Sequence, residues 1–161
     1  MDRLWAPWRM AYVSGASQKS PGCLLCDALA STDDRAALIL CRKPLAFLIL
    51  NTFPYTPGHL MAVVSRHVGA LEDAAPEELG EALALVQSAM RALTAVYRPD
   101  GFNVGVNQGR AAGAGVAGHL HLHVVPRWDG DSNFMPVLGD VRVLPESLEA
   151  TYDRLRPGLA P

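Results

Sequence analysis

The chain has 161 residues, half of them hydrophobic and 19% charged, and its formal net charge is −2. These values indicate one folded domain and exclude a whole-protein field that would attract nucleic acid. A negatively charged substrate must therefore be held by local groups, such as main-chain N–H donors, histidines or a few arginines. The sequence has no long apolar run typical of a secretion signal or a membrane span. Its three cysteines suggest no disulfide framework, so we expect a cytoplasmic protein without membrane or nucleic-acid partners.

The first half of the chain predicts an arm followed by a helix and a set of strands. Trp5, Trp8 and a polar run ending in proline and glycine indicate an irregular N-terminal arm at residues 1–22, ahead of a single domain at residues 23–161. The NTFPYTPGH segment is predicted to be a loop because it contains two prolines and a glycine. The other predicted elements are a helix at 23–30, a hairpin with strands at 37–41 and 46–50, and a strand at 60–65.

A long helix is predicted from Pro76 to Tyr97. Pro76 suits the first helical position, and the two glutamates after it suit the positive end of the helix dipole. The apolar side chains that recur at helical spacing are Leu79, Leu83, Val86, Met90, Leu93 and Val96. The remaining predicted elements are a strand at 102–107, a loop at 108–118, a strand at 119–125 ended by Pro126, and a helix at 145–156. This order predicts an α+β fold with an antiparallel sheet of about five strands.

Three histidines alternate with apolar residues at positions 119–125, HLHLHVV. Because strand side chains alternate between faces, three imidazoles are predicted on one face and the leucines on the other. The apolar side chains are explained as core, but three imidazoles on one buried face require partners. Three interpretations stay open from these residues: hydrogen-bonded structural histidines, a three-histidine metal site, and a histidine nucleophile that attacks phosphorus as a neutral imidazole.

A glycine-rich loop leads directly into this strand. Gly109, Gly113, Gly115 and Gly118 leave it poor in side chains, which lets main-chain N–H groups approach phosphate oxygens closely. A lone glycine-rich loop is weak evidence, but one that runs into alternating histidines favours the nucleophile.

The motif GHLHLHVVPRW at residues 118–128 resembles the signature of the histidine triad (HIT) family, in which His-x-His-x-His precedes two apolar residues. Residues 51–59 and the strand and Arg66-His67-Val68 after them are similar to the family's ribose-binding loop and following strand. GFNVGVNQG is similar to the strand and loop before the triad. The resemblance therefore implies a HIT-like fold with one long and one C-terminal helix.

Both ends of the chain extend the resemblance to one branch of the family. The start LWAPWRMAY and the end of the chain, including Glu149-Ala150-Thr151-Tyr152, resemble the bacterial diadenosine tetraphosphate (AP4A) phosphorylases.

The resemblance implies roles for individual residues. His121, the middle histidine, would be the nucleophile that attacks an α-phosphate and forms a nucleotidyl-histidine. His123 and His59 would line the same pocket, and Asn51 would bond the ribose. Without the resemblance, His59 would be a surface turn histidine and Asn51 a plain turn residue. The other candidates for binding nucleotide or phosphate are Asn107, Gln108, Gly113, Ala114, Gly115, Val116 and Trp128.

The chain departs from the family pattern just before the triad. Many members carry Gln-Ser or Gln-Thr four and three residues before the first histidine, where this chain has Gly115-Val116. Main-chain N–H groups of Ala114, Gly115 and Val116 are expected to replace these side chains, and such donors are worth ~2.7–4 kcal/mol each to an anionic transition state. The departure leaves the acceptor, water or phosphate, open. Trp128 either stacks on the leaving nucleotide or packs at a subunit interface.

Cys23 and Cys26 form a CxxC pair, and a structural zinc site needs two further ligands. The resemblance implies that His67 and His119 supply them. Four protein ligands leave no open position, so such a zinc would be structural. The alternative is a pair of buried cysteines without metal. Cys41 is expected to be a small core residue.

The resemblance implies an enzyme that cleaves dinucleoside polyphosphates, AP4A in the first instance, to ADP and ATP with inorganic phosphate as acceptor. The same residues would serve a hydrolase that uses water, on dinucleoside polyphosphates or nucleoside phosphoramidates. Two other classes remain: a metalloenzyme with all three triad histidines on one ion, and a nucleotide-sensing module without turnover. Family members pair through the long helix and a strand, so a homodimer is expected.

Overall fold

The computed structural model describes residues 22–131 and 146–159, so the predicted arm with Trp5 and Trp8 lies outside the described residues apart from Gly22. The strands are β1 (Ile39–Arg42), β2 (Ala46–Leu50), β3 (Leu60–Val64), β4 (Gly101–Val106) and β5 (His121–Arg127). They form one antiparallel sheet in the order β1-β2-β3-β5-β4. The helices are α2 (Leu24–Ala30), α3 (Pro76–Tyr97) and α5 (Leu148–Leu155), with short 3-10 turns η1 (Leu71–Asp73), η2 (Arg110–Ala112) and η3 (Arg156–Gly158). The predicted α+β fold with five antiparallel strands is confirmed.

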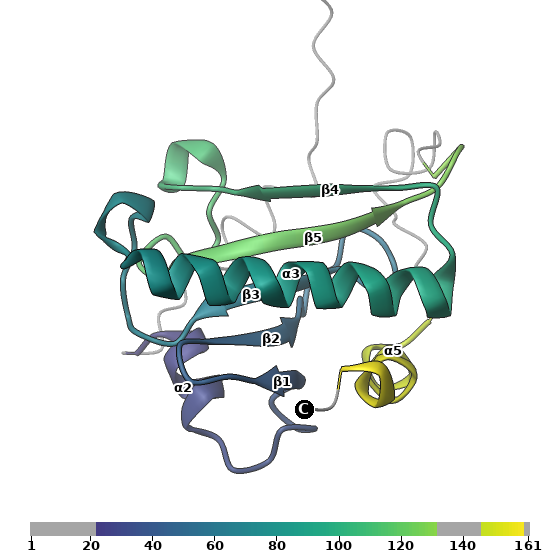
Figure 1. Cartoon of the computed structure of the whole chain (residues 1–161), viewed down its shortest axis with the longest axis horizontal. Coiled ribbons are helices and arrows are strands. Elements are labelled where there is room, and N and C mark those ends of the chain that lie inside the picture. The colour runs from purple at the N-terminus through teal and green to yellow at the C-terminus, as the bar shows by residue number, and fades with distance from the viewer. Residues whose placement is uncertain (1–21, 132–145, 160–161) are drawn as a thin grey trace, which may run out of the picture.

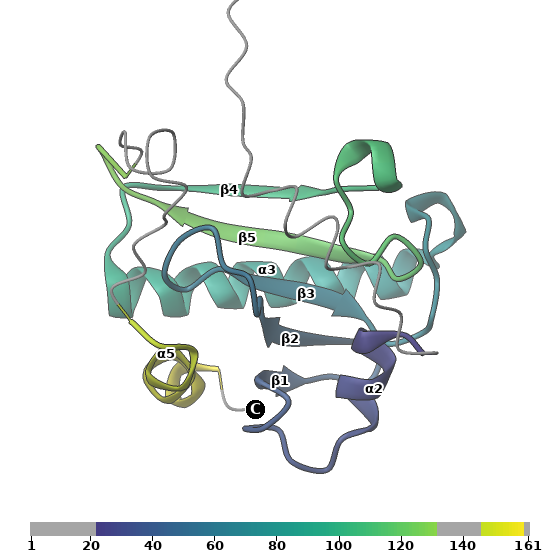
Figure 2. The ribbon, with the colours of Figure 1, turned by 180° about the vertical axis from the view of Figure 1, so that it is seen from behind.

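The two faces of the sheet pack against different elements. Helix α3 crosses one face (Figure 1), where strand side chains such as Leu48, Leu60 and Val124 join its apolar side in the main core. On the opposite face, a smaller cluster around Phe47 and Val63 packs against Leu25 of α2. His121 pairs with Val63 across β5 and β3, and His123 pairs with Met61, so both lie on this second face. Figure 2 shows this face, which we call the histidine face.

Helix α3 has the predicted bounds and a buried acid at its start. The Glu78 carboxylate accepts the Ala75 N–H at 2.8 Å and a bidentate pair from Arg66 at 2.9 and 2.8 Å. These bonds lower the pKa of Glu78 to about 2, with Arg66 as the largest cause. Leu83 is an exception to the predicted apolar face because its side chain is 52% exposed. The buried stripe instead runs through smaller residues, including Ala82 and Ala89.

Strand β5 differs from the prediction at both ends. It begins at His121, because His119 and Leu120 lie beyond the last residue of β3 with which β5 pairs. It also runs through Pro126 instead of ending before it. Beyond Val124, β5 has β4 as its one partner, so Pro126 sits where its missing N–H removes no ladder bond to β3.

Helix α5 begins at Leu148, later than predicted, because Ser147 caps it by accepting the Ala150 N–H at 3.2 Å. The predicted start, Pro145, lies outside the described residues.

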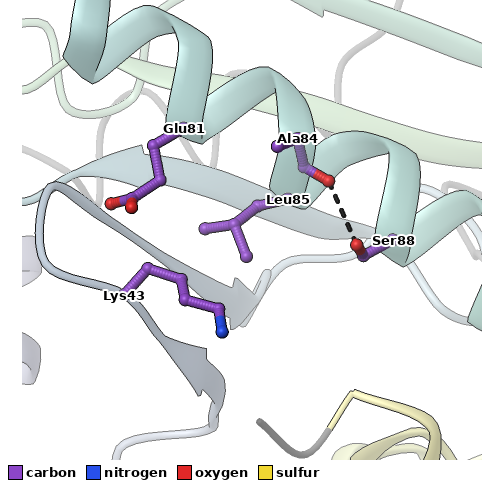
Figure 3. Close-up of a pocket in the computed structure, with 5 residues that line it drawn as sticks. All are labelled: Lys43, Glu81, Ala84, Leu85 and Ser88. Carbon is purple, nitrogen blue, oxygen red and sulfur yellow. Dashed lines mark hydrogen bonds between the residues drawn. The ribbon is translucent and has the colours of Figure 1, made fainter.

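A hollow of about 170 Å³ lies between the β1–β2 turn and α3 (Figure 3). Its lining residues are Lys43, Glu81, Ala84, Leu85 and Ser88. It contains no histidine or cysteine and lies on the α3 side of the sheet, away from the histidine face. Among the described residues, no helix combines the length and apolar character needed to cross a bilayer.

Candidate catalytic histidines and metal site

The histidines of the chain separate into two groups, one just before β5 and one along the first residues of that strand. His67 and His119 lie with the two cysteines of α2. His59 and His123 lie together, with ring centroids 5.2 Å apart, and the ring of His121 is 4.9 Å from that of His123. The prediction that three imidazoles line one strand face therefore holds for two of them. His119 precedes the strand and turns toward the cysteines, which argues against a single ion held by all three triad histidines.

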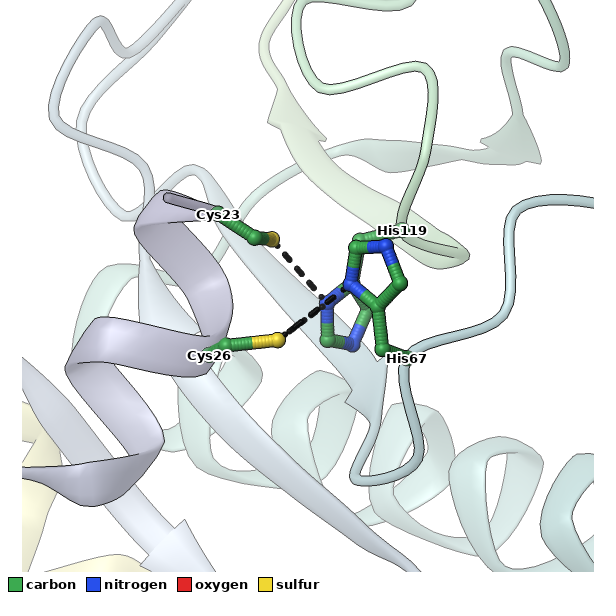
Figure 4. Close-up of side chains that lie close together, drawn as sticks. All are labelled: Cys23, Cys26, His67 and His119. Carbon is green, nitrogen blue, oxygen red and sulfur yellow. Dashed lines mark hydrogen bonds between the residues drawn. The ribbon is translucent and has the colours of Figure 1, made fainter. Parts of the chain in front are cut away.

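The first group has the geometry of a four-ligand metal site (Figure 4). The Cys23 Sγ lies 3.3 Å from His119 Nδ1, and the Cys26 Sγ lies 3.3 Å from His67 Nδ1 and 3.5 Å from His119 Nδ1. All four donor atoms fall within 4.8 Å of one another. Tetrahedral zinc, with bonds of about 2.3 Å to sulfur and about 2.0–2.1 Å to nitrogen, separates S and N ligands by about 3.5 Å. The residues present therefore fit zinc.

A main-chain acceptor orients His119 for this role. Its Nε2 lies 2.7 Å from the Val64 carbonyl, so the N–H sits on Nε2 and Nδ1 is left as the ligand atom. The side chain is fully buried, and burial lowers its pKa, which keeps the imidazole neutral. A neutral ring with its lone pair aimed at the cysteines is the form that binds metal.

The same arrangement orients His121. Its Nδ1 lies 2.7 Å from the His119 carbonyl, so Nδ1 carries the proton and Nε2 carries the lone pair. The described residues offer Nε2 no hydrogen bond. Burial lowers the pKa of His121, whose side chain is 5% exposed, so the ring is neutral near pH 7. A neutral imidazole with one fixed N–H and one basic nitrogen is a nucleophile that needs no separate base.

His59 and His123 form a short chain of hydrogen bonds that starts at the main chain. The Tyr55 N–H donates to His59 Nδ1 at 3.1 Å, so a neutral His59 carries its proton on Nε2. That N–H donates to His123 Nδ1 at 3.0 Å, which places the proton of a neutral His123 on Nε2. Burial, together with the neighbouring His121, lowers the pKa of His123 to about 4. His123 therefore offers an N–H donor beside His121.

The Pro-Gly-His turn places His59 inside the protein. Gly58 has φ +76°, and a Cβ there would lie 2.7 Å from Leu93 of α3, so the turn requires glycine. His59 is 1% exposed, which contradicts a surface turn histidine. Asn51 starts this loop and accepts the Phe53 N–H at 2.9 Å, while its amide nitrogen lies 3.4 Å from both ring nitrogens of His59. The loop thus brings Asn51 to the histidine pair.

The glycine-rich loop supplies fewer free donors than predicted. The Gly113 N–H donates to Arg110 O at 3.0 Å and the Ala114 N–H to Gly109 O at 3.2 Å, because the loop forms the turn η2. In this conformation the N–H groups of Gly113 and Ala114 are therefore already bonded within the loop, and the phosphate-binding roles of these two residues stay predictions. The N–H groups of Gly115 and Val116 make no hydrogen bond with a described residue.

Other side chains of this region have definite neighbours. Val116 packs against the apolar cluster of the histidine face, next to α2. Gln108 accepts the Leu71 N–H at 2.7 Å and donates to Glu72 at 2.9 Å, so its amide ties the loop to η1. Asn107 follows the end of β4 and is half-buried. Trp128 follows the end of β5, and its N–H donates to Asp131 at 3.1 Å.

The sequence did not reveal the main-chain partners of these histidines. The carbonyls of Val64 and His119 and the N–H of Tyr55 decide which ring nitrogen is protonated in each case. Because every residue carries these groups, no residue type marks them.

Comparisons with known proteins agree with this arrangement. Residues 33–130 match the family model described as the HIT domain. An AP-4-A phosphorylase of Mycobacterium tuberculosis is 43% identical over 157 residues, which cover 94% of this chain and 80% of that protein. A bis(5'-nucleosyl)-tetraphosphatase (asymmetrical) of Schizosaccharomyces pombe is 31% identical over 90 residues, 56% of this chain and 49% of that protein.

A solved structure resembles this chain over most of its length. It is a Zn-bound histidine triad family protein from Mycobacterium smegmatis, with a TM-score of 0.68 and 27% identity. The match covers 87% of this chain and 94% of that chain.

Proposed function

The chain belongs to the histidine triad (HIT) family, and from that premise we propose that it cleaves dinucleoside polyphosphates through a nucleotidyl group carried on His121. The proposed substrate is AP4A, and the proposed acceptor is inorganic phosphate, which gives ADP and ATP. The 43% identity with the mycobacterial AP-4-A phosphorylase supports this substrate class, and the similarity to a tetraphosphatase supports the same chemistry with water.

In the first step, Nε2 of His121 forms a bond to the α-phosphorus, and the bond from that phosphorus to the bridging oxygen breaks, so ATP leaves. The imidazole gains a positive charge, which the His119 carbonyl stabilises through Nδ1–H. In the second step, a phosphate oxygen attacks the same phosphorus, the N–P bond breaks, and ADP leaves with a neutral His121. The Nε2–H of His123 and the N–H groups of Gly115 and Val116 are proposed to hold phosphate oxygens during both steps.

A single observation carries this proposal. The 2.7 Å hydrogen bond from Nδ1 of a buried, neutral His121 to the His119 carbonyl leaves Nε2 as its one basic nitrogen. A structural histidine bonded at both nitrogens lacks such a nitrogen, and among the described residues His121 is not part of the group of four that could hold a metal ion.

We propose that zinc occupies the site formed by Cys23, Cys26, His67 and His119. The distances fit tetrahedral zinc, and the similar Zn-bound protein supports it. Four protein ligands make the ion structural: it ties α2 to the segment that precedes His121. A reducing cytoplasm, the proposed location, keeps both thiols available as ligands.

Product analysis tests the function. Protein incubated with AP4A and inorganic phosphate should yield ADP and ATP, and acid-quenched samples should lose an acid-labile AMP adduct that alkaline quenching preserves. His121→Ala should reduce turnover by at least about 10³-fold, the loss typical of removing a covalent nucleophile, and should show no adduct. His67→Ala serves as the comparison: it should lose zinc but retain the ability to form the adduct when the protein is folded.

Other outcomes identify the alternatives. AMP and ATP formed regardless of phosphate would indicate a hydrolase. Tight nucleotide binding without product or adduct would indicate a sensing module and refute the enzyme. Loss of metal in His123→Ala would indicate a catalytic ion held by the triad.

A further inference from the structure

The C-terminal end of α2 is held by one arginine from the sheet. Arg42, the last residue of β1, donates from Nη1 to the Leu29 carbonyl at 2.6 Å and from Nη2 to the Ser31 carbonyl at 2.8 Å. A longer contact of 3.5 Å joins Nη2 to Ala28 O. The Leu29 and Ser31 carbonyls lie where a helix end leaves carbonyls without intrahelical partners, and α2 ends without the glycine that commonly closes a helix. A cation at this position also favours the negative end of the helix dipole.

Arg42 is itself fixed at both ends. Its Nε donates to Asp34 at 2.7 Å, and its main chain lies in β1 opposite Phe47 of β2. The ion pair is partly shielded, with the two side chains 31% and 33% exposed. The planar guanidinium thereby joins a rigid strand to the end of α2 through several donors in one plane, a geometry that lysine cannot reproduce.

Helix α2 depends on such an anchor. It has seven residues, and Leu25 is its one fully buried side chain. A helix this short is unstable by itself, so its place in the protein comes from outside contacts. Cys26 belongs to the same short helix, so an anchor at Leu29 and Ser31 also helps to set the position of its Sγ, which lies 3.3 Å from His67 Nδ1.

We propose that Arg42 is a positioning residue for the metal site: by clamping the C-terminal end of α2, it holds Cys23 and Cys26 within ligand distance of His67 and His119 before the ion arrives. The inference rests on the proposed zinc site. A ligand set that is preformed binds metal more tightly. If only a fraction of the molecules hold the four ligands in the binding geometry, the apparent affinity falls by that fraction. Through His119, the clamp also steadies the carbonyl that orients His121.

Zinc affinity tests the clamp. The dissociation constant is measured on the full chain by competition with a chromogenic chelator for the wild type, Arg42→Ala, Arg42→Lys and Asp34→Asn. Arg42→Ala should bind zinc about 10–100-fold more weakly, the usual loss when an outer partner of a metal site is removed. Arg42→Lys should lose nearly as much, and Asp34→Asn should lose less, because the guanidinium keeps its carbonyl contacts.

Arg35→Ala is the matched control. Arg35 is another arginine of the same region, but its guanidinium pairs with Asp153 on the surface and lies near the Tyr152 ring, both on α5 and not on α2. Its loss should leave zinc affinity unchanged. Excess zinc should restore kcat in Arg42→Ala to the wild-type value, a rescue that a defect in the catalytic histidines themselves would not show.

The same measurements have a different outcome if Arg42 only stabilises the fold. In that case, the melting temperatures with zinc and with chelator would fall equally in Arg42→Ala, and the zinc affinity would match the wild type; this outcome refutes the clamp. A wild type that binds no zinc refutes the metal site and the clamp together. If Arg42→Ala fails to fold, Arg42→Lys and Asp34→Asn decide the question by the same affinity measurement.

Discussion

At the scale of single residues, main-chain groups set the chemical state of the histidines. Carbonyls fix the protons of His119 and His121 on opposite ring nitrogens, Nε2 in the first and Nδ1 in the second. One imidazole therefore has the protonation that the proposed metal ligand needs and the other has the protonation that the proposed nucleophile needs, although they are two positions apart in the same segment. The difference in role comes from the hydrogen bond that each ring makes and not from residue type.

His123 should make stability depend on pH in the acid range. Its pKa is about 4 in the folded protein, below the ordinary value of 6.5, because burial and His121 disfavour the charged ring. Between these values the unfolded chain binds more protons, so the free energy of unfolding falls as pH falls from 6.5 toward 4. Between pH 7 and pH 5 the expected loss from this residue is about 2 kcal/mol.

Denaturant unfolding of wild type and His123→Asn at pH 7 and pH 5 measures the contribution of His123 to the free energy of unfolding. Both proteins share any acid loss from metal release or from the other histidines, so the wild type should lose about 2 kcal/mol more than the variant. Equal losses in the two proteins would show that His123 is not held neutral by the fold.

At the scale of elements, the sequence predicts what periodicity and turn residues encode. The bounds of α3, the β1–β2 hairpin and the face shared by His121 and His123 all follow from such patterns. Contacts between distant segments have no such pattern. The late start of β5 depends on where its pairing with β3 ends, and the exposure of Leu83 depends on which elements pack against α3.

The same limit applies to the candidate site. The triad, the Pro-Gly-His turn and the CxxC pair are visible in the sequence as residue types at fixed spacing. Arg42 was not recognised, because in the sequence it is one residue of a turn between strands, and its partners are carbonyls. A leucine or serine whose carbonyl accepts such a bond cannot be distinguished in the sequence from any other leucine or serine.

Gly69 illustrates how one loop fixes another. A Cβ at this position would lie 3.1–3.3 Å from main-chain atoms of Ala117 and Gly118, the residues just before His119. Gly69→Ala should therefore push the glycine-rich loop and destabilise the protein by about 1–3 kcal/mol, the usual effect of overpacking. It should also lower kcat/KM, because the N–H groups of Gly115 and Val116, the proposed phosphate donors, belong to the same loop.

Gly80→Ala is the control for this change. Gly80 lies on α3 with nothing within 4 Å of an added Cβ, so the substitution should stabilise the helix by about 0.5–1 kcal/mol and leave kcat/KM unchanged. Chemical denaturation and steady-state kinetics on both variants supply the comparison. Wild-type kinetics in Gly69→Ala would mean that the contact between the two loops does not set the catalytic geometry.

At the scale of the whole molecule, the packing helix and the candidate functional groups lie on opposite faces of the sheet. Helix α3 fills one face, and the candidate catalytic and metal groups occupy the histidine face. Among the described residues, the edge strand β4 pairs with β5 on one side and with no strand on the other. An open edge offers its unpaired N–H and C=O groups to another strand, and a second copy of the chain is the simplest symmetric partner.

Val104 tests the homodimer expected from the sequence. It lies in the middle of β4, on the face that Phe102 and Val106 share with the main core, and is 44% exposed. A twofold interface along this edge would bring the two copies of this region together, so Val104→Lys would bury like charges near each other. The variant should dimerise at least about tenfold more weakly, as expected when a central contact costs more than ~1.4 kcal/mol. Light scattering at matched concentrations should then give the monomer mass.

Leu24→Lys on α2, which replaces another exposed apolar side chain, should leave the dimer intact. A wild type of monomer mass, or a variant that stays dimeric at every concentration, would place any assembly surface elsewhere than on β4.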